Sequence, residues 1–106
     1  MIKRMLWVLS FSVLTACGSH HYRVDGDHMT LILRKPKAKT VVFFCSLDGF
    51  VAHPATHLSG RWEVRLPAGN AFSYFYWVDD KLFTPDCPAK ETDDFGSENC
   101  IYDPQR

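Results

Sequence analysis

Cysteine and histidine are the residues whose chemistry this chain could use most directly, because both bind transition metals and cysteine also forms disulfides. The sequence holds four cysteines and five histidines. Zinc sites use closely spaced ligands such as Cys-x-x-Cys, and that spacing does not occur. His53 and His57 are four residues apart, but Pro54 follows His53 and the segment is predicted to be a loop rather than a helix. We therefore expect neither a metal site nor a cofactor.

Residues typical of catalysis are also not arranged in a recognisable motif. The sequence has no phosphate-binding loop, no Gly-rich dinucleotide fingerprint and no His-Glu-x-x-His. The pairs Asp79-Asp80 and Asp93-Asp94 are adjacent, so their side chains point apart on an extended chain and are typical of turns. The 12 basic and 12 acidic residues balance, which gives no electrostatic reason to bind nucleic acid. We expect a protein that is not an enzyme and has no nucleic-acid partner.

The N-terminal segment has the three-part plan of a secretory signal. Lys3 and Arg4 precede an apolar run from Met5 to Leu14, and small residues follow. A helix that spans a bilayer needs about 20 apolar residues, roughly twice the length of this run. A permanent transmembrane anchor is therefore the weaker interpretation.

The four residues 14–17, Leu-Thr-Ala-Cys, resemble the bacterial lipobox, in which signal peptidase II cuts before a cysteine that becomes lipidated. The resemblance implies a signal peptide over 1–16 and acyl chains on Cys17. Two or three acyl chains give a stable membrane anchor, whereas one gives only reversible binding. Gly18 stands where lipoproteins retained in the inner membrane carry aspartate, so the resemblance implies the outer membrane. Residues 17–28 are polar without periodicity, and we expect a lipidated tether there before a domain over 29–106.

Three cysteines remain once Cys17 is assigned to lipid, and an oxidising compartment would allow them three alternative pairings. Cys87 and Cys100 flank twelve residues rich in Pro, Asp, Gly and Ser. Closing a loop of that length stabilises a domain by roughly 3 kcal/mol. This favours a Cys87–Cys100 disulfide with Cys45 free.

Apolar residues from Met29 onward recur with the period of two that is typical of strands. Residues 61–66 alternate, which places Trp62, Val64 and Leu66 on a core face. Residues 71–78 carry apolar or aromatic side chains on both faces: Phe72, Tyr74, Tyr76 and Val78 on one, and Ser73, Phe75 and Trp77 on the other. Further strands are expected at 29–33, 40–45, 81–84 and 99–102. Six or seven short strands predict a small antiparallel immunoglobulin-like β-sandwich.

The order of motifs over residues 39–102 resembles the carbohydrate-binding module of the AMP-activated protein kinase β subunit and the early-set domains of branching enzymes and isoamylases. The matching segments are VVFFCSLDGF at 41–50, GRWEVRLPAG at 60–69, Val-Asp at 78–79 and DFGSEN at 94–99. Glycan-binding members stack two tryptophans on glucose, reach hydroxyls with a lysine, and complete the site with a Leu-x-Thr-x-Asn loop. The matched positions hold Phe50 and Leu82 or Phe83, then Phe75, then Phe95, Ser97 and Asn99, and only the asparagine is unchanged.

These exchanges of polar for aromatic residues favour a protein partner. We expect Phe50, Phe75 and Trp77 to form an aromatic patch that binds another envelope protein, because large aromatic side chains dominate protein interfaces. The alternative is a carbohydrate-binding protein that stacks an α-glucan or envelope polysaccharide on Phe50 and Phe75, with Ser97 and Asn99 bonding its hydroxyls. Structural roles also remain open: the tether or the Cys87–Cys100 loop covering the patch, Phe50 plugging a loop, and Asn99 bonding turn backbone.

Overall fold

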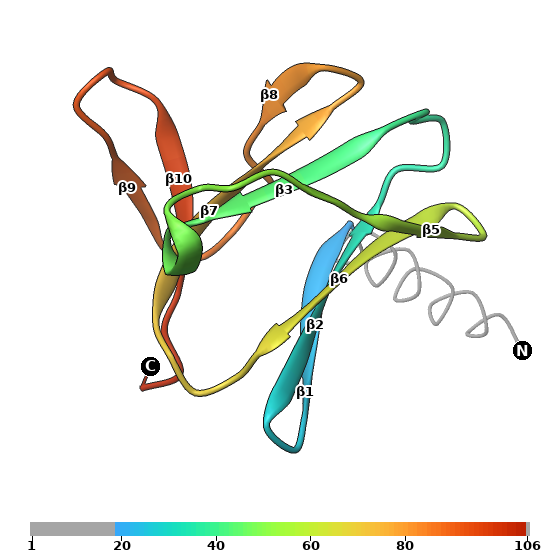
Figure 1. The fold of residues 1–106 in the computed structure, drawn as a ribbon. Helices are drawn as coiled ribbons and strands as arrows, with labels where there is room; N and C mark the ends of the chain where they lie inside the picture. Colours follow the sequence, from blue (N-terminus) through green and yellow to red (C-terminus); the bar gives the residue numbers. More distant parts are fainter. Residues whose placement is uncertain (1–18, 106) are drawn as a thin grey trace, which may run out of the picture.

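Turn residues and alternating side chains divide the chain into short strands in the computed structural model, which describes residues 19–105 (Figure 1). Ten strands and one turn of 3-10 helix occur within these residues. In chain order they are β1 (His20–Asp25), β2 (His28–Arg34), β3 (Val41–Cys45), η1 (Ser46–Asp48), β4 (His53–Pro54), β5 (Thr56–Leu58), β6 (Arg61–Pro67), β7 (Phe72–Val78), β8 (Lys81–Phe83), β9 (Lys90–Thr92) and β10 (Glu98–Tyr102).

The strands form two antiparallel sheets that pack as a small sandwich, as the sequence predicts. One sheet has the order β1-β2-β6-β5, and the other has the order β4-β3-β7-β10-β9, with β8 also paired to β7. In Figure 1 the β3–β7 pair crosses above the β2–β6 pair, and the β1–β2 and β9–β10 hairpins project from opposite ends. The count exceeds the predicted six or seven because β1, β4, β5 and β9 pair along the sheet edges.

The core lies between the facing sides of the two sheets and confirms the predicted alternation. Trp62 is buried, and Val64 and Leu66 pack against the core from the same face of β6. The inward positions of β7 meet them from the other sheet. The buried core residues are Met29, Leu31, Leu33, Val41, Phe43, Cys45, Trp62, Phe72, Tyr74, Tyr76, Cys100 and Tyr102.

The prediction that residues 17–28 form a tether is wrong from residue 20 onward. Residues 20–25 form β1 and pair with all of the facing positions of β2 from Leu33 to His28. Gly26, at a φ of 70°, lets the chain turn back within two residues. The folded domain therefore begins at residue 20 instead of residue 29, and the two strands form a hairpin that sequence periodicity did not reveal.

Residues 53–58, expected to be a loop, also form strands. Two residues of β4 pair with β3, and β5 pairs with β6, so the segment passes from one sheet to the other. His53 consequently bonds Asp48, while the His57 ring stacks on Trp62 at a centroid distance of 4.2 Å. The two histidines are therefore engaged in different sheets.

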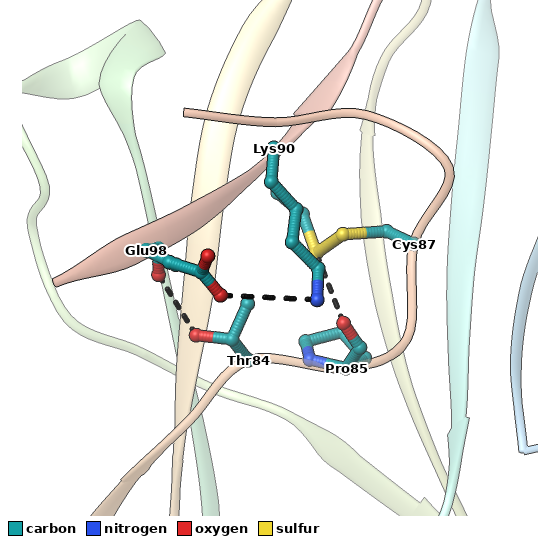
Figure 2. Close-up of polar contacts among 6 residues, drawn as sticks. Thr84, Pro85, Cys87, Lys90 and Glu98 are labelled. Atoms are coloured by element: carbon teal, nitrogen blue, oxygen red, sulfur yellow. Dashed lines mark hydrogen bonds and ion pairs between the residues drawn. A yellow bond between two sulfur atoms is a disulfide. The ribbon is translucent and has the colours of Figure 1, made fainter. Parts of the chain in front are cut away.

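The disulfide joins Cys87 to Cys100, as predicted, and Cys45 is free and buried. Figure 2 shows how the chain after β8 is fastened to β10 around this bond. The Thr84 hydroxyl donates to the carbonyl oxygen of Glu98 at 2.8 Å, and Lys90 Nζ lies 3.9 Å from Glu98 Oε1. The loop from Thr84 to Ala89 is thereby held against the second sheet.

A polar contact across the sandwich links the edge strand β1 to the other sheet. His20 Nε2 lies 2.9 Å from the Tyr76 hydroxyl, and the imidazole ring stacks beside Tyr74 with centroids 5.8 Å apart. Burial lowers the pKa of His20 to about 4, with a smaller contribution from His21. At neutral pH the imidazole is uncharged and suited to this half-buried position.

Protonation of His20 should therefore destabilise the fold in acid. The unfolded chain binds this proton below pH 6.5 and the folded chain only below about pH 4, so stability falls as pH drops through that window. The loss should approach about 3 kcal/mol once the pH is below both values. Urea denaturation of wild type and His20→Gln at pH 7 and pH 4 gives the change in the free energy of unfolding between the two pH values for each protein. The loss due to His20 is the difference between these two changes, because the contributions of other titrating groups cancel. Parallel pH profiles for the two proteins would contradict the assignment.

Candidate functional site

The outward side of the six-stranded sheet carries an apolar surface centred on β7. Cross-strand pairing places Phe75 beside Phe44 and Trp77 between Val42 and Leu82. Directly paired residues project from the same face of a sheet, and the neighbouring residues Tyr74 and Tyr76 project into the core. We call this surface the aromatic face and define it as Val42, Phe44, Phe50, Phe75, Trp77 and Leu82.

Four rings of the aromatic face form a stacked cluster. Phe75 stacks on Phe44 with centroids 4.9 Å apart and on Phe50 with centroids 5.8 Å apart. Trp77 lies 5.0 Å from Phe44 on the other side. Phe44 is buried and Phe75 is partly buried, whereas Phe50 and Trp77 are 39% and 44% exposed. The cluster thus supports two accessible aromatic side chains on a packed base.

Phe50 reaches this cluster through a strained loop. The residue has a φ of 64°, a left-handed conformation that costs side chains other than glycine about 1–2 kcal/mol. Its N–H donates to the Cys45 carbonyl at 2.8 Å. Asp48 secures the loop by accepting the Val51 N–H at 3.2 Å and by its 2.5 Å hydrogen bond with His53, which is the main cause that lowers the pKa of Asp48. These contacts hold the Phe50 ring over Phe75.

The other edge of the aromatic face depends on the Asp79-Asp80 turn. Both residues have positive φ, at 50° and 65°, which confirms the expected turn and lets β8 fold back on β7. Asp79 Oδ1 accepts the N–H groups of Thr40 at 2.9 Å and Lys39 at 2.7 Å, and these bonds lower its pKa. The turn is thereby tied to the start of β3, and Leu82 is set beside Trp77.

The structure brings together Phe50, Phe75 and Trp77 in the ring cluster, whereas Ser97 and Asn99 lie outside that cluster. Ser97 lies in the β9–β10 turn, where its N–H donates to Asp93 Oδ1 at 3.0 Å. Asn99 lies in β10 directly before Cys100, which pairs with Tyr74, so Asn99 is on the same outward side of the sheet as Phe75, and it is only 5% exposed. Within residues 19–105, no side-chain hydrogen bond or ring contact joins either residue to the aromatic face. Cys17 lies outside the described residues.

Sequence reasoning missed Phe44 and Val42 as members of this surface. The strand at 41–45 is apolar at every position, so its sequence does not show which side faces the core. Pairing with β7 decides it, because Val41, Phe43 and Cys45 lie opposite the residues of β7 that project inward. The alternation of β7 was therefore the only sequence signal that could have assigned the faces of β3.

A hollow of about 470 Å³ lies beside the Phe50 loop and is lined by Cys45, Asp48, His53 and residues of β6. A cysteine, a histidine and a carboxylate together are reminiscent of nucleophilic catalysis. Burial, however, raises the pKa of the Cys45 thiol, which disfavours the reactive thiolate. No group of three or more metal-binding side chains occurs in the part of the chain that the structure describes.

No family model and no curated protein sequence matches the chain. Among residues 19–105, no helix has both the length and the apolar character needed to cross a bilayer.

The left-handed conformation of Phe50 predicts an unusual order of stability. Phe50→Ala should lose the ring contact and keep the backbone strain, whereas Phe50→Gly loses the contact and relieves the strain, so the glycine variant should be more stable by about 1 kcal/mol. Chemical denaturation of both variants measures this difference. The adjacent Val51 is exposed and has no positive φ, so Val51→Gly should instead be less stable than Val51→Ala. The same order at both positions would contradict the strained conformation.

Proposed function

We propose that the protein is a non-enzymatic lipoprotein of the outer membrane whose aromatic face binds an apolar surface of another envelope protein. The observation that carries this proposal is the exposure of Phe50 and Trp77 on a stacked aromatic base. Apolar residues clustered on the surface of a small domain mark interaction sites, and large aromatic side chains supply most of the binding energy at such sites.

The packed base supports this role because it fixes the exposed rings before any partner arrives. Phe44 and Phe75 restrict the rings that lie on them, and Asp48 and Asp79 hold the loop and the turn at either end of the surface. Side chains that are already ordered lose less conformational entropy on binding. The aromatic face is therefore suited to a flat apolar protein surface.

Burial of the polar positions weighs against polysaccharide as the ligand. Sugar hydroxyls need hydrogen-bond partners to offset their desolvation. Asn99 is only 5% exposed, so little of its amide is open to bond a glycan that stacks on Phe75. Carbohydrate binding through stacking on Phe50 and Phe75 is retained as the alternative that the experiment below distinguishes.

The anchor part of the proposal rests on the sequence at 14–17 and on the position of β1. The folded domain begins at His20, three residues after Cys17. Three extended residues span about 10 Å, so lipidation of Cys17 would hold the sandwich against the membrane surface. A partner reached by the aromatic face would then be a membrane protein or a protein bound close to the membrane.

Photo-crosslinking in intact cells tests the protein partner. A benzophenone amino acid at position 77 should give a discrete adduct with one envelope protein, and Phe75→Ser should remove most of that adduct because it breaks up the ring cluster. Phe95, 94% exposed on the β9–β10 turn, offers the matched control position and should give no such adduct. Equal adducts from positions 77 and 95 would contradict the proposal. Amide shifts at Phe50 and Phe75 on titration with malto-oligosaccharides would favour the carbohydrate alternative.

Substitution of Cys17 tests the anchor. Cys17→Ala should abolish both the incorporation of labelled palmitate and the cut before residue 17, because both depend on this cysteine. Cys45→Ala is the matched control and should keep both the label and the cut, since Cys45 is buried in the core. Palmitate label or cleavage that survives in the Cys17 variant would contradict the lipid anchor.

A further inference from the structure

A hollow lies at the open seam between the two sheets, on the opposite margin of the sandwich from the Phe50 loop. Its volume is about 430 Å³, which is within the range of small-molecule sites. Its walls come from β1, the end strand of one sheet, from β7 and β10 of the other, and from the segment 86–89. We call this hollow the seam cavity.

Three tyrosines form the aromatic wall of the seam cavity: Tyr22, Tyr74 and Tyr102. Tyr22 packs edge-on against Tyr102 with centroids 5.1 Å apart, and Tyr74 stacks beside His20. Burial raises the pKa of Tyr74 and of Tyr102, and Tyr22 adds to the shift of both. The raised pKa values keep Tyr74 and Tyr102 uncharged at neutral pH.

The charged groups of the seam cavity are acidic. Asp86 and Asp103 line it, and no lysine or arginine occurs among its described lining residues. Asp103 accepts the N–H of Gln105 at 2.9 Å, whereas Asp86 is exposed and makes no ion pair with any residue in 19–105. His20 is uncharged at neutral pH because burial lowers its pKa to about 4. A ligand in the cavity would therefore meet aromatic rings together with carboxylate charge.

We propose that the seam cavity binds an organic ammonium cation, with its alkyl groups against Tyr22, Tyr74 and Tyr102 and its charge balanced by Asp86. Aromatic rings attract ammonium groups through their electron-rich faces, and a nearby carboxylate adds a direct charge interaction. A neutral sugar would use the rings and hydroxyls but would gain little from the carboxylates. The site is independent of the aromatic face, so it can exist whether or not that face binds a protein.

The disulfide gives the seam cavity a rigid wall. Cys87, Pro88 and Ala89 line it, and Cys87 is bonded to Cys100 in β10. Figure 2 shows that the same loop is held by Thr84 and by the contact between Lys90 and Glu98. Asp86 is part of this fastened loop and lines the cavity, so its position relative to the rest of the wall is fixed without a ligand. Such preorganisation lowers the entropy lost on binding.

An amide-correlation NMR titration of the full chain in a non-ionic detergent tests the proposal. Choline chloride should cause saturable shifts at Tyr22, Tyr74, Asp86 and Tyr102, relative to an equal concentration of sodium chloride. Dimethylbutanol, the uncharged carbon isostere of choline, should bind at least about tenfold more weakly because it lacks the charge. Equal affinity for the two compounds would overturn the proposal and leave only an apolar hollow. No saturable shift with millimolar choline would overturn it as well.

Two variants locate the binding. Tyr22→Ala removes an aromatic wall whose side chain is 51% exposed, and Asp86→Asn removes the charge from an exposed loop residue, so both should fold. Each should weaken choline binding by roughly tenfold. Asp94→Asn, in the exposed β9–β10 turn, is the matched control and should bind as wild type does. Choline affinity that is unchanged by Asp86→Asn, or reduced equally by Asp94→Asn, would overturn the assignment to this cavity.

Discussion

The alternation of side chains along β7 is the constraint on which the rest of the structure depends. This strand pairs with β3, β8 and β10, so it fixes the order of one whole sheet. Phe72, Tyr74 and Tyr76 project into the core and require a second sheet to cover them, whereas Phe75 and Trp77 project outward. A strand with large apolar side chains on both faces needs apolar contacts on both faces to bury them. Within the described residues, the second sheet covers only the inward face of β7.

Polar residues act mainly at the ends of this apolar arrangement. Asp48 and Asp79 each accept backbone N–H groups from a neighbouring segment, and Asp93 does the same in the β9–β10 turn. Such bonds satisfy loop backbone without placing charge between the sheets. They also leave the centre of the aromatic face free of charged side chains, so its chemistry is determined by rings and aliphatic groups.

The sequence was informative where pattern and local chemistry agree. The alternation at 61–66 and 72–78 predicted the sandwich and the side chains on each of the two faces of β7. The spacing of Cys87 and Cys100 predicted their disulfide. It was uninformative at residues 20–25, where only Tyr22 and Val24 alternate with charged residues and two histidines precede them, so the run is too short to predict a strand. The seam cavity could not be predicted, because its walls come from segments far apart in the chain that meet only when both sheets are in place.

The way in which β1 enters the fold determines how the domain would respond to force. His20 pairs with Leu33, and after Arg34 the chain leaves β2 at the same end of the hairpin. Tension applied at residue 19 would therefore open the β1–β2 ladder one pair at a time, a geometry in which each hydrogen bond resists alone. The contact of His20 with Tyr76 lies at the first pair to be opened, so it adds resistance at the point where the strands begin to separate. The edge strand is thus the mechanically weak element of the domain.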